Sequence, residues 1–411
     1  RTHKPEVSGS IPLPATKFMQ NIHDKKFFIG VFFLTILIII FLREPCWLTE
    51  GSLKPDAFGY YADGKSKDFL DNLFYVYPGT GVLMFWSNIT NSIITLFPIN
   101  IAKLLANYLT LLIYLTIFTH IYFTKSILFT NYKHKIFAIF IILLSPPMTP
   151  EVWMSSAHLR GYFGIFSFIL LFHDFKNEKK VVNNITNFLI FFSGICSIYA
   201  AALTPAYFFK FYLNRNKNDL KRFLFALSAF FIQSIIIVNY IYFNFSETKR
   251  FHFELSTIYS YFYNVPIRSF FGSHLPKSLF LNTEIYKVQY FNFFIYFLFI
   301  SIFLMMLLYL KKKNDKISFI MFFSLILVSS LVFGSIMPGF AGGRYAVVPG
   351  VIIIFIIFRF YIIENNFFLK NLFLLLLVSS LTIGSLEYRY MSPLPNLLKC
   401  IDFSSEIYQI K

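Results

Sequence analysis

The stretch FFIGVFFLTILIIIFL, residues 27–42, contains no charged side chain and no proline. A helix needs about 17–25 mostly apolar residues to cross the roughly 30 Å hydrocarbon core of a bilayer, so this stretch predicts a membrane-spanning helix over residues 27–43. It ends in Arg43-Glu44-Pro45, without the small residues of a signal-peptide cleavage site. We therefore expect a retained membrane anchor that follows a basic segment, 1–26.

Similar apolar runs recur along the chain. Of its 411 residues, 56% are hydrophobic and only 14% are charged, and 57 are Phe. Water-soluble folds alternate polar and apolar faces, whereas these runs mostly do not. The composition predicts an all-α polytopic membrane protein. About eleven spanning helices are expected, over 27–43, 99–124, 136–147, 158–173, 185–200, a short sixth helix ending at Asn214, 222–243, 291–310, 317–337, 345–360 and 369–386.

The net charge of +17 is concentrated in a few loops. Membrane proteins retain basic loops in the cytoplasm, so the distribution predicts a cytoplasmic N-terminus and a periplasmic C-terminus. The basic runs act as topology signals near anionic headgroups, and nucleic-acid binding is not expected. Six loops hold 22 of the 37 Lys and Arg residues but only 7 of the 20 acidic residues, and they are 1–26, 125–135, 173–183, 210–222, 311–316 and 359–370.

Residues 81–97 are apolar but contain Ser, Asn and Thr. They fit either a spanning helix or a helix that lies in the outer interface. We choose the interface, because a spanning helix would move Lys125 and every later basic loop to the outer side. The expected organisation is a single transmembrane domain, 27–386, with external loops 44–98 and 244–290 and a periplasmic tail, 387–411.

The three cysteines show no metal-ligand spacing, and no His, Cys and carboxylate pattern of a metal site occurs in the sequence. No metal and no cofactor are therefore expected. Cys46 and Cys400 both fall on the predicted outer side, where they could form a disulfide. Cys196 is expected to be an apolar residue inside a helix.

The less common polar residues concentrate at the outer ends of the predicted helices, and the middle of the membrane is poor in charge. A transporter usually carries ionisable groups or broken helices near the midplane. An enzyme that works at the outer surface would instead place its polar groups where these lie. They are Asp56, Glu151, His158, Arg160, Arg344 and the pair Glu44 and Glu50.

Asp56 lies in the polar stretch that follows the first apolar run. A carboxylate there can remove the proton of a sugar hydroxyl as that hydroxyl attacks an anomeric carbon. One base suffices when the leaving group is a phosphate, which departs without a general acid. Alternatively, Asp56 caps a short interfacial helix that begins at Ala57, and the two roles are compatible.

The segment 147–160 is rich in proline at its start and leads into the fourth predicted helix. Non-helical backbone at membrane depth needs protein partners or a water-filled cavity. Trp153 could stack on a pyranose ring, while Glu151 and His158 could hydrogen-bond to its hydroxyls. The alternative is an interfacial Trp whose neighbours extend their polar ends to water.

A glycine-rich corner, residues 338–349, carries Arg344. Glycines let the backbone approach a ligand, and the Arg fork can hold a phosphate in two hydrogen bonds. The alternative is a tight turn whose Arg reaches lipid headgroups. The loop 244–290 mixes cations, among them Arg268, with many Tyr and Phe, which suits either an entrance for a lipid phosphate or a loop that lies on the membrane.

These motifs resemble the GT-C superfamily of glycosyltransferases that use polyprenyl-phosphate-sugars. Asp56 precedes the aromatic pair Tyr60-Tyr61, and Tyr77-Pro78-Gly79 leads into an interfacial run and a long second helix. The chain length and the basic N-terminal segment are similar to those of phage-type, serotype-converting O-antigen glucosyltransferases. Two further motifs resemble those of a bacterial branch that modifies surface polysaccharide. They are Pro150-Glu151-Val152 with His158, and Gly342–Tyr345 with Pro349.

The resemblance implies inverting transfer of a sugar, for example glucose, from an undecaprenyl-phosphate-sugar donor. The implied acceptor is a surface polysaccharide such as lipopolysaccharide O-antigen, or a lipid-linked glycan, at the periplasmic face of the bacterial inner membrane. Asp56 is the implied base and Glu151 a second catalytic acid. Many relatives have two adjacent acids where this chain has Asp56-Ala57, so Glu44 or Glu151 could replace Asp56 as the base. The implied substrate contacts are Glu44, Tyr60, Trp153, His158, Arg160, Arg268, Arg344 and Tyr345.

Two other functions remain open from the sequence. An O-antigen polymerase or ligase would also present external arginines and a large outer loop, but it would depend on several arginines instead of an acid. A flippase for lipid-linked sugars would line a path through the midplane with polar groups, and the shortage of charge within the apolar runs speaks against it.

Overall fold

The computed structural model describes residues 30, 32–40, 53, 55–77, 81–146, 152–244, 260–272, 297, 301, 304–333 and 343–390. Within these residues the structure is helical, and the one pairing of extended backbone is an isolated bridge between Ser126 and His173. The prediction of an all-α protein is confirmed for the part of the chain that is described.

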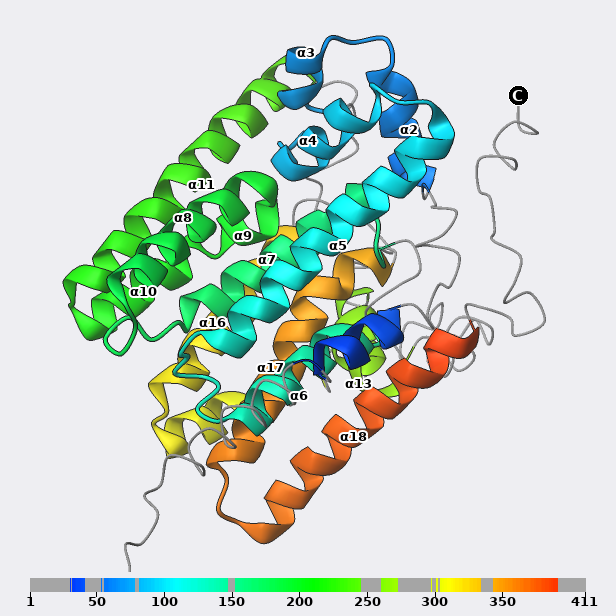
Figure 1. Cartoon of the computed structure of the whole chain (residues 1–411). Helices are drawn as coiled ribbons and strands as arrows, with labels where there is room; N and C mark the ends of the chain where they lie inside the picture. Colours follow the sequence, from blue (N-terminus) through cyan, green and yellow to red (C-terminus); the bar gives the residue numbers. More distant parts are fainter. Residues whose placement is uncertain are drawn as a thin grey trace, which may run out of the picture.

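The helices lie close to the predicted apolar runs (Figure 1). Residues 32–40 and 304–313 are helical within the first and eighth predicted spans. The helices of the first half are α2 Pro55–Gly64, α3 Phe69–Leu73, α4 Phe85–Ile94, α5 Ile99–Phe123, α6 Tyr132–Leu144, η2 Ser156–His158, α7 Leu159–Leu171 and α8 Lys180–Cys196. Those of the second half are α9 Ile198–Ala202, α10 Thr204–Asn214, α11 Lys217–Asn244, η3 Tyr263–Ile267, α13 Arg268–Phe271, α16 Lys316–Leu331, η7 Gly343–Ala346, α17 Val347–Ile363 and α18 Phe367–Tyr390.

Several helices are suited to a bilayer. Among the described residues, four segments are long and apolar enough to cross a membrane, and they are Ile99–Phe123, Lys217–Phe243, Arg344–Ile363 and Phe367–Glu387. A fifth membrane-spanning segment results if α8 and the stretch Ile198–Asn214 are counted as one bent span. These helices support a membrane protein, while the larger number of eleven spans stays a prediction.

The centre of the bundle is the pair α7 and α17. All residues of α7 except Arg160 are buried. In the segment Arg344–Ile363, which contains α17, 78% of an apolar stretch of 18 residues is buried. Glycines at positions 161 and 164 share one face of α7, because residues three apart in a helix are neighbours. A Cβ on Gly161 would lie 3.6 Å from Val347, and one on Gly164 would lie 3.1 Å from Val348. Position 161 has room for a Cβ, whereas position 164 does not, so Gly164 is the residue that lets α17 lie close against α7.

The outer helices present apolar side chains to the surroundings. In α11 only 17% of an apolar stretch of 18 residues is buried inside the bundle, and the same fraction holds for α18. Phe231, Val238, Phe368 and Leu375 are each more than half exposed. A soluble domain rarely exposes so much contiguous apolar surface, so these faces fit contact with lipid.

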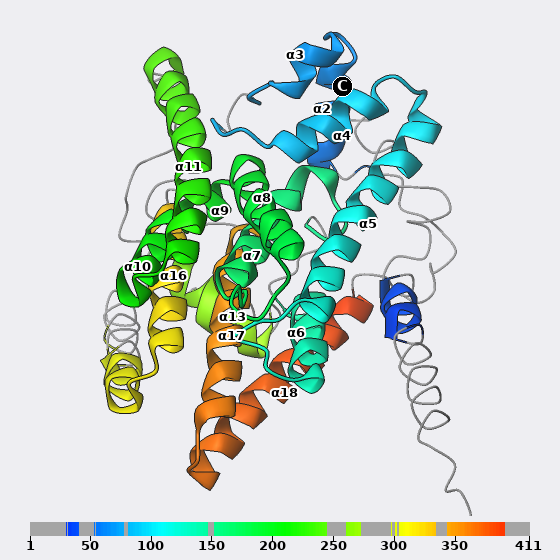
Figure 2. The same ribbon diagram turned by 60° about the vertical axis from the view of Figure 1, so that its left-hand side comes forward.

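The helices of the segment predicted to be the first external loop gather at one end of the bundle. Figures 1 and 2 both show α2, α3 and α4 together there, beyond the first residues of α5. The interfacial interpretation of 81–97 agrees with the length of α4, since ten residues extend only about 15 Å.

Five of the six predicted basic loops lie together at the opposite end. Lys125 Nζ donates to Asn177 O at 2.7 Å, and Arg222 Nη2 donates to His173 O at 3.0 Å. Arg359 forms two hydrogen bonds with Asp315, at 2.9 and 3.0 Å. The ring of Phe358, beside Arg359, packs on that of His134, so these two groups of loops are neighbours.

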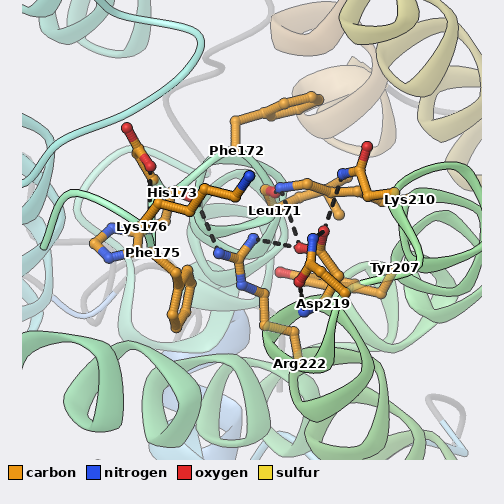
Figure 3. Close-up of polar contacts among 12 residues, drawn as sticks. Leu171, Phe172, His173, Phe175, Lys176, Tyr207, Lys210, Asp219 and Arg222 are labelled. Atoms are coloured by element: carbon orange, nitrogen blue, oxygen red, sulfur yellow. Dashed lines mark hydrogen bonds and ion pairs between the residues drawn. The ribbon is translucent and has the colours of Figure 1, made fainter. Parts of the chain in front are cut away.

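A buried ionic cluster joins two of these loops, 173–183 and 210–222 (Figure 3). Asp219 lies 3.1 Å from Arg222 Nη1 and 3.8 Å from Lys210 Nζ, and all three side chains are at most 5% exposed. Lys210 also donates to the carbonyl of Leu171, while Arg222 donates to that of His173. The two cations therefore bind carbonyls at and just beyond the C-terminus of α7, where the helix dipole favours positive charge.

The fifth predicted helix, 185–200, ends earlier than expected, at Cys196. The chain bends by 115° between α8 and the next helices, at Ser197. The hydroxyl of Ser197 accepts from Ala200 N–H and donates to Arg160 O at 2.6 Å, so it begins a new helix and fixes it to α7. Proline is tolerated in the first turn of a helix, which is where Pro205 lies in α10.

Two helices begin earlier than predicted because polar residues cap them. Asn131 Oδ1 accepts from His134 N–H at 2.9 Å, so α6 begins at Tyr132. Asn216 Oδ1 accepts from Asp219 N–H at 2.8 Å, and α11 begins at Lys217. Capping side chains satisfy N–H groups that a helix start leaves open, and they extend helices beyond the apolar pattern.

A glycine substitution tests the contact of α7 with its neighbours. In Gly164→Ala the new Cβ would lie 2.7 Å from Tyr199 Cβ, closer than packed atoms allow. We expect the free energy of unfolding to fall by about 1–3 kcal/mol, which would appear as a lower thermal unfolding midpoint in detergent. Gly161→Ala is the matched control, because its nearest neighbour would be at 3.6 Å and alanine favours the helix. Equal stability of the two variants would contradict the close packing.

Asp219 tests the ionic cluster. Asp219→Asn removes the negative charge and leaves two buried cations without their counter-ion. We expect a loss of about 3–5 kcal/mol of stability, measured as a lowered unfolding midpoint in detergent. Asp71→Asn, at an exposed position of α3, is the control and should change stability by less than about 0.5 kcal/mol. A stable Asp219→Asn protein would show that the cluster does not hold the loops.

Candidate functional site

Three side chains from distant parts of the chain meet at Asp56. Its Oδ2 lies 3.2 Å from Arg344 Nη1 and 3.2 Å from His158 Nε2. The Asp56 side chain is 44% exposed and that of Arg344 is 32% exposed, whereas that of His158 is only 5% exposed. The carboxylate thus contacts a buried imidazole on its inner side and remains accessible to the surroundings.

Asp56 is held by α2 at the end of the bundle. It lies in the first turn of this helix, one residue after the helix begins at Pro55, so the predicted capping of a helix starting at Ala57 is wrong. A negative charge in the first turn is favoured by the helix dipole. The side chain faces η2 and η7 and so joins three elements.

His158 occupies the last position of η2, and its backbone N–H donates to Ser155 O at 3.1 Å. Its Nδ1 lies 3.2 Å from Ser155 Oγ, while Nε2 faces the carboxylate of Asp56. A neutral imidazole satisfies both contacts when Ser155 donates to Nδ1 and the proton sits on Nε2. His158 then donates to Asp56 and fixes the direction of its carboxylate.

Arg160 adds a second arginine beside this carboxylate. Its Nη1 lies 3.7 Å from the thioether of Met84, which is the one side-chain hydrogen-bond contact of Arg160 among the described residues. A thioether is a weak acceptor and carries no charge. The guanidinium of Arg160 therefore adds positive charge near Asp56 without a carboxylate of its own in the described part of the chain.

These neighbours lower the pKa of Asp56 below its usual value. The largest cause is the hydrogen bond from His158, and partial burial opposes it by disfavouring the charged form. The positive charges of Arg344 and Arg160 lower the pKa further. Asp56 is therefore ionised at neutral pH and could accept a proton.

Tyr60 lies one helical turn after Asp56 and is buried. Its ring packs on that of Tyr77 with centroids 4.3 Å apart, and its hydroxyl lies 4.0 Å from Met84 Sδ. Met84 therefore lies between Tyr60 and Arg160. The sequence analysis missed Met84, because a thioether in an apolar run carries no signal of a site.

Gln233 holds the segment that carries Met84. This side chain lies in the middle of α11 and is only 1% exposed. Its amide donates to Leu83 O at 2.8 Å, and its carbonyl accepts from Leu83 N–H at 3.2 Å. The same amide also donates to Ile195 O at 3.1 Å. A single glutamine thus ties the start of α4 to the end of α8, which positions Met84 behind the two arginines.

Trp153 does not present an open ring. It is 2% exposed, and it packs edge-on against Tyr114 with centroids 5.5 Å apart. The next residue, Met154, has a positive φ of 50° and donates its N–H to the Tyr114 hydroxyl at 3.2 Å. The predicted stacking of a sugar on Trp153 therefore does not match this conformation, in which Trp153 supports the turn that leads to His158.

Two further predicted contacts are also buried. Arg268 was predicted in an exposed loop, but it is 8% exposed at the start of α13, which packs against α17 and α18. Tyr345 is 3% exposed, and the guanidinium of Arg344 lies 5.2 Å from its ring. Tyr345 therefore supports Arg344 by a cation–π contact. Arg268 belongs to the packing of η3 and α13 near η7 and not to an open entrance.

Some predicted positions lie outside the described residues. These include the two other acids of the predicted site. Cys196 is buried, as expected of an apolar residue. The positions outside are Glu44, Glu151, Cys46 and Cys400.

The described site therefore consists of one accessible carboxylate, one buried imidazole and two arginines at one end of the bundle. Within the described residues no group of three or more His, Cys, Asp and Glu side chains could hold a metal ion. No family model, no curated protein and no solved structure matches this chain.

Proposed function

We propose that the protein is a membrane glycosyltransferase of the GT-C type that takes a sugar from a polyprenyl-phosphate donor. The donor is undecaprenyl-phosphate-sugar, with glucose as the first candidate, and the acceptor is a surface polysaccharide such as lipopolysaccharide O-antigen or a lipid-linked glycan. The observation that carries the proposal is the half-exposed carboxylate of Asp56, held by His158 and flanked by Arg344 and Arg160.

The position of the site supports this function. Asp56 lies at the end of the bundle opposite to the basic loops around Lys125, Arg222 and Arg359. Basic loops stay in the cytoplasm, so the site would face the periplasm of a bacterial inner membrane. A polyprenyl donor could reach it laterally from the bilayer, along the exposed apolar faces of the outer helices.

The charge of the site suits a phosphate. Arg344 and Arg160 both add positive charge beside Asp56, and Arg160 forms no ion pair with a described residue. Arginine forks bind phosphate oxygens in two parallel hydrogen bonds. The donor phosphate would complete the charge balance between Arg344 and Arg160.

The proposed chemistry depends on the two groups that can bind Arg344, which are the carboxylate of Asp56 and the donor phosphate. In the described state this arginine contacts Asp56 at 3.2 Å, which lowers the basicity of the carboxylate. When a phosphate binds Arg344, the carboxylate loses part of this contact and becomes a better base. The proton of the acceptor hydroxyl then moves to Asp56 as its oxygen bonds to the anomeric carbon. The bond from that carbon to the phosphate oxygen breaks, and the arginines stabilise the departing phosphate.

One observation favours a second candidate. The side chain of Arg160 hydrogen-bonds only to a thioether among the described residues, so it could bind the diphosphate of a lipid-linked oligosaccharide, as an O-antigen polymerase or ligase would require. The two candidates differ in the donor, which is a lipid monophosphate with one sugar in the first and a lipid diphosphate with an oligosaccharide in the second.

The base is tested by removing its charge. We expect Asp56→Asn to insert and fold but to lose sugar transfer by at least about 100-fold, since general-base catalysis contributes roughly 10²–10⁴ in rate. The measurement uses purified protein in vesicles with radiolabelled undecaprenyl-phosphate-glucose and glycan acceptors extracted from host membranes. Asp63→Asn, on the same helix, is the control and should keep the wild-type rate.

Each other outcome of this assay has a definite meaning. An Asp56→Asn protein as active as the wild type would remove the assignment of the base. If the wild-type protein extends glycans only from a diphosphate-linked oligosaccharide, the polymerase or ligase candidate replaces the first one.

The pH dependence tests the role of His158. The pKa of Asp56 lies below its ordinary value, so the wild-type rate should stay level as the pH falls from about 7 towards 4. His158→Ala removes the largest cause of this lowering, and the acid limb of kcat/KM should move to higher pH. The ionised Asp56 also contributes to the stability of the fold. This contribution is present above the pKa of the unfolded state and is lost as the pH falls through the lower pKa of the folded state. An unchanged acid limb in His158→Ala would contradict the contact.

A further inference from the structure

A row of three tyrosine rings lies along α2 beside Asp56. Tyr60 follows Asp56 by one helical turn, and its ring packs against that of Tyr77 with centroids 4.3 Å apart. Tyr75 continues the row, because its ring meets that of Tyr77 edge-on with centroids 6.2 Å apart. Tyr60 is buried, whereas Tyr75 and Tyr77 are partly exposed. The row therefore has a buried inner ring and two outer rings that a ligand can contact.

Tyr77 lies on the same face of α2 as Asp56. A Cβ on Gly59 would lie 3.4 Å from the Tyr77 hydroxyl, and Gly59 follows Asp56 by three residues, so the two share one face of the helix. Partial burial and the negative charges of Asp63 and Asp56 raise the pKa of Tyr77 above its usual value. The hydroxyl of Tyr77 is therefore protonated at neutral pH and lies within electrostatic reach of Asp56.

The outer rings are held in place by contacts of their own segment. Asn88 of α4 is buried, and its amide donates to Leu73 O at 3.1 Å and to Tyr75 O at 2.8 Å. Lys67 Nζ lies 4.2 Å from the centroid of the Tyr75 ring and donates to the backbone carbonyl of Asp63 at 3.0 Å. Because these contacts fix the segment before a ligand arrives, little conformational freedom is lost on binding.

Partly exposed tyrosines beside a carboxylate suit a sugar ring. The face of an aromatic ring carries partial negative charge, which attracts the C–H groups of a sugar, and the tyrosine hydroxyl can exchange hydrogen bonds with sugar hydroxyls. Trp153, the residue predicted to stack on a sugar, is buried. Tyr77 and Tyr75 are placed to make the contact that Trp153 does not make in this conformation.

We propose that Tyr77 and Tyr75 form a platform that binds a sugar ring of the acceptor glycan. The inference rests on the proposed function. The acceptor hydroxyl must lie against Asp56, which takes its proton, while the donor phosphate lies against Arg344 and Arg160. The sugar ring that carries this hydroxyl then lies against Tyr77, and the glycan continues towards Tyr75.

The position of the platform favours the acceptor over the donor. The donor is a lipid, and its polyprenyl chain would approach along the apolar faces of the outer helices. The platform instead lies with α2 and α3 at the end of the bundle, beyond the first residues of α5 (Figures 1 and 2). A polar glycan can reach this end from water without entering the bilayer.

The test measures the kinetics of the two substrates separately. Full-length protein in vesicles is given radiolabelled undecaprenyl-phosphate-glucose, and the concentrations of this donor and of the glycan acceptor from host membranes are varied in turn. We expect Tyr77→Leu to raise the acceptor KM by about tenfold and to leave the donor KM and kcat unchanged, because a contact made equally before and during the reaction affects KM alone. Tyr77→Phe keeps the ring and should keep the acceptor KM within about threefold.

Tyr132→Leu is the matched control. Tyr132 is 49% exposed at the start of α6, at the end of the bundle opposite to Asp56. Both KM values should stay at the wild-type level. Tyr75→Leu serves as a second variant if Tyr77→Leu does not fold, and it should raise the acceptor KM by about threefold or more with an unchanged donor KM.

The outcomes separate the two proposals. If the wild-type protein transfers glucose while Tyr77→Leu and Tyr75→Leu keep the acceptor KM, or raise the donor KM instead, the platform is wrong and the proposed function stands. If Tyr77→Phe raises the acceptor KM as much as Tyr77→Leu, the hydroxyl and not the ring makes the contact, and the platform is wrong as well. A wild-type protein that transfers no sugar overturns both proposals.

Discussion

The close contact between α7 and α17 is the constraint on which the candidate site depends. His158 and Arg160 lie at the start of α7, and Arg344 lies just before α17, so the distance between these helices sets the distance between their polar groups. The helices approach because Gly164 presents no side chain to Val348 at the start of α17. Small residues at helix contacts serve this purpose in membrane proteins, where packing replaces the hydrophobic effect as the main attraction.

The second constraint is the cost of charge in an apolar medium, which sorts ionisable groups to the two ends of the bundle. At one end, cations bind carbonyls at the C-terminus of α7 and share the buried carboxylate of Asp219. At the other end, arginines surround Asp56, which stays half exposed. The first arrangement is buried and binds backbone carbonyls, which suits a structural role. The second is open to the surroundings, which suits a ligand.

The proposed transferase uses this difference. An anionic donor would complete the charge balance that Arg344 and Arg160 leave open, and its arrival would release Asp56 to act as a base. Gln233, Met84 and Tyr60 form a buried support behind these groups, since the glutamine fixes the segment that carries the methionine. Binding and proton transfer would then both depend on the meeting of α2, η2 and η7.

The sequence by itself determined the helical class, most helix positions and the common location of the basic loops, because apolar length and loop charge are local properties that a bilayer enforces. It also pointed to Asp56, His158 and Arg344 as separate candidates. Only the tertiary structure decided that these three meet, since Asp56 and Arg344 are 288 positions apart. Only packing decided that Trp153 and Arg268 are buried, because burial depends on neighbours that are distant in the chain.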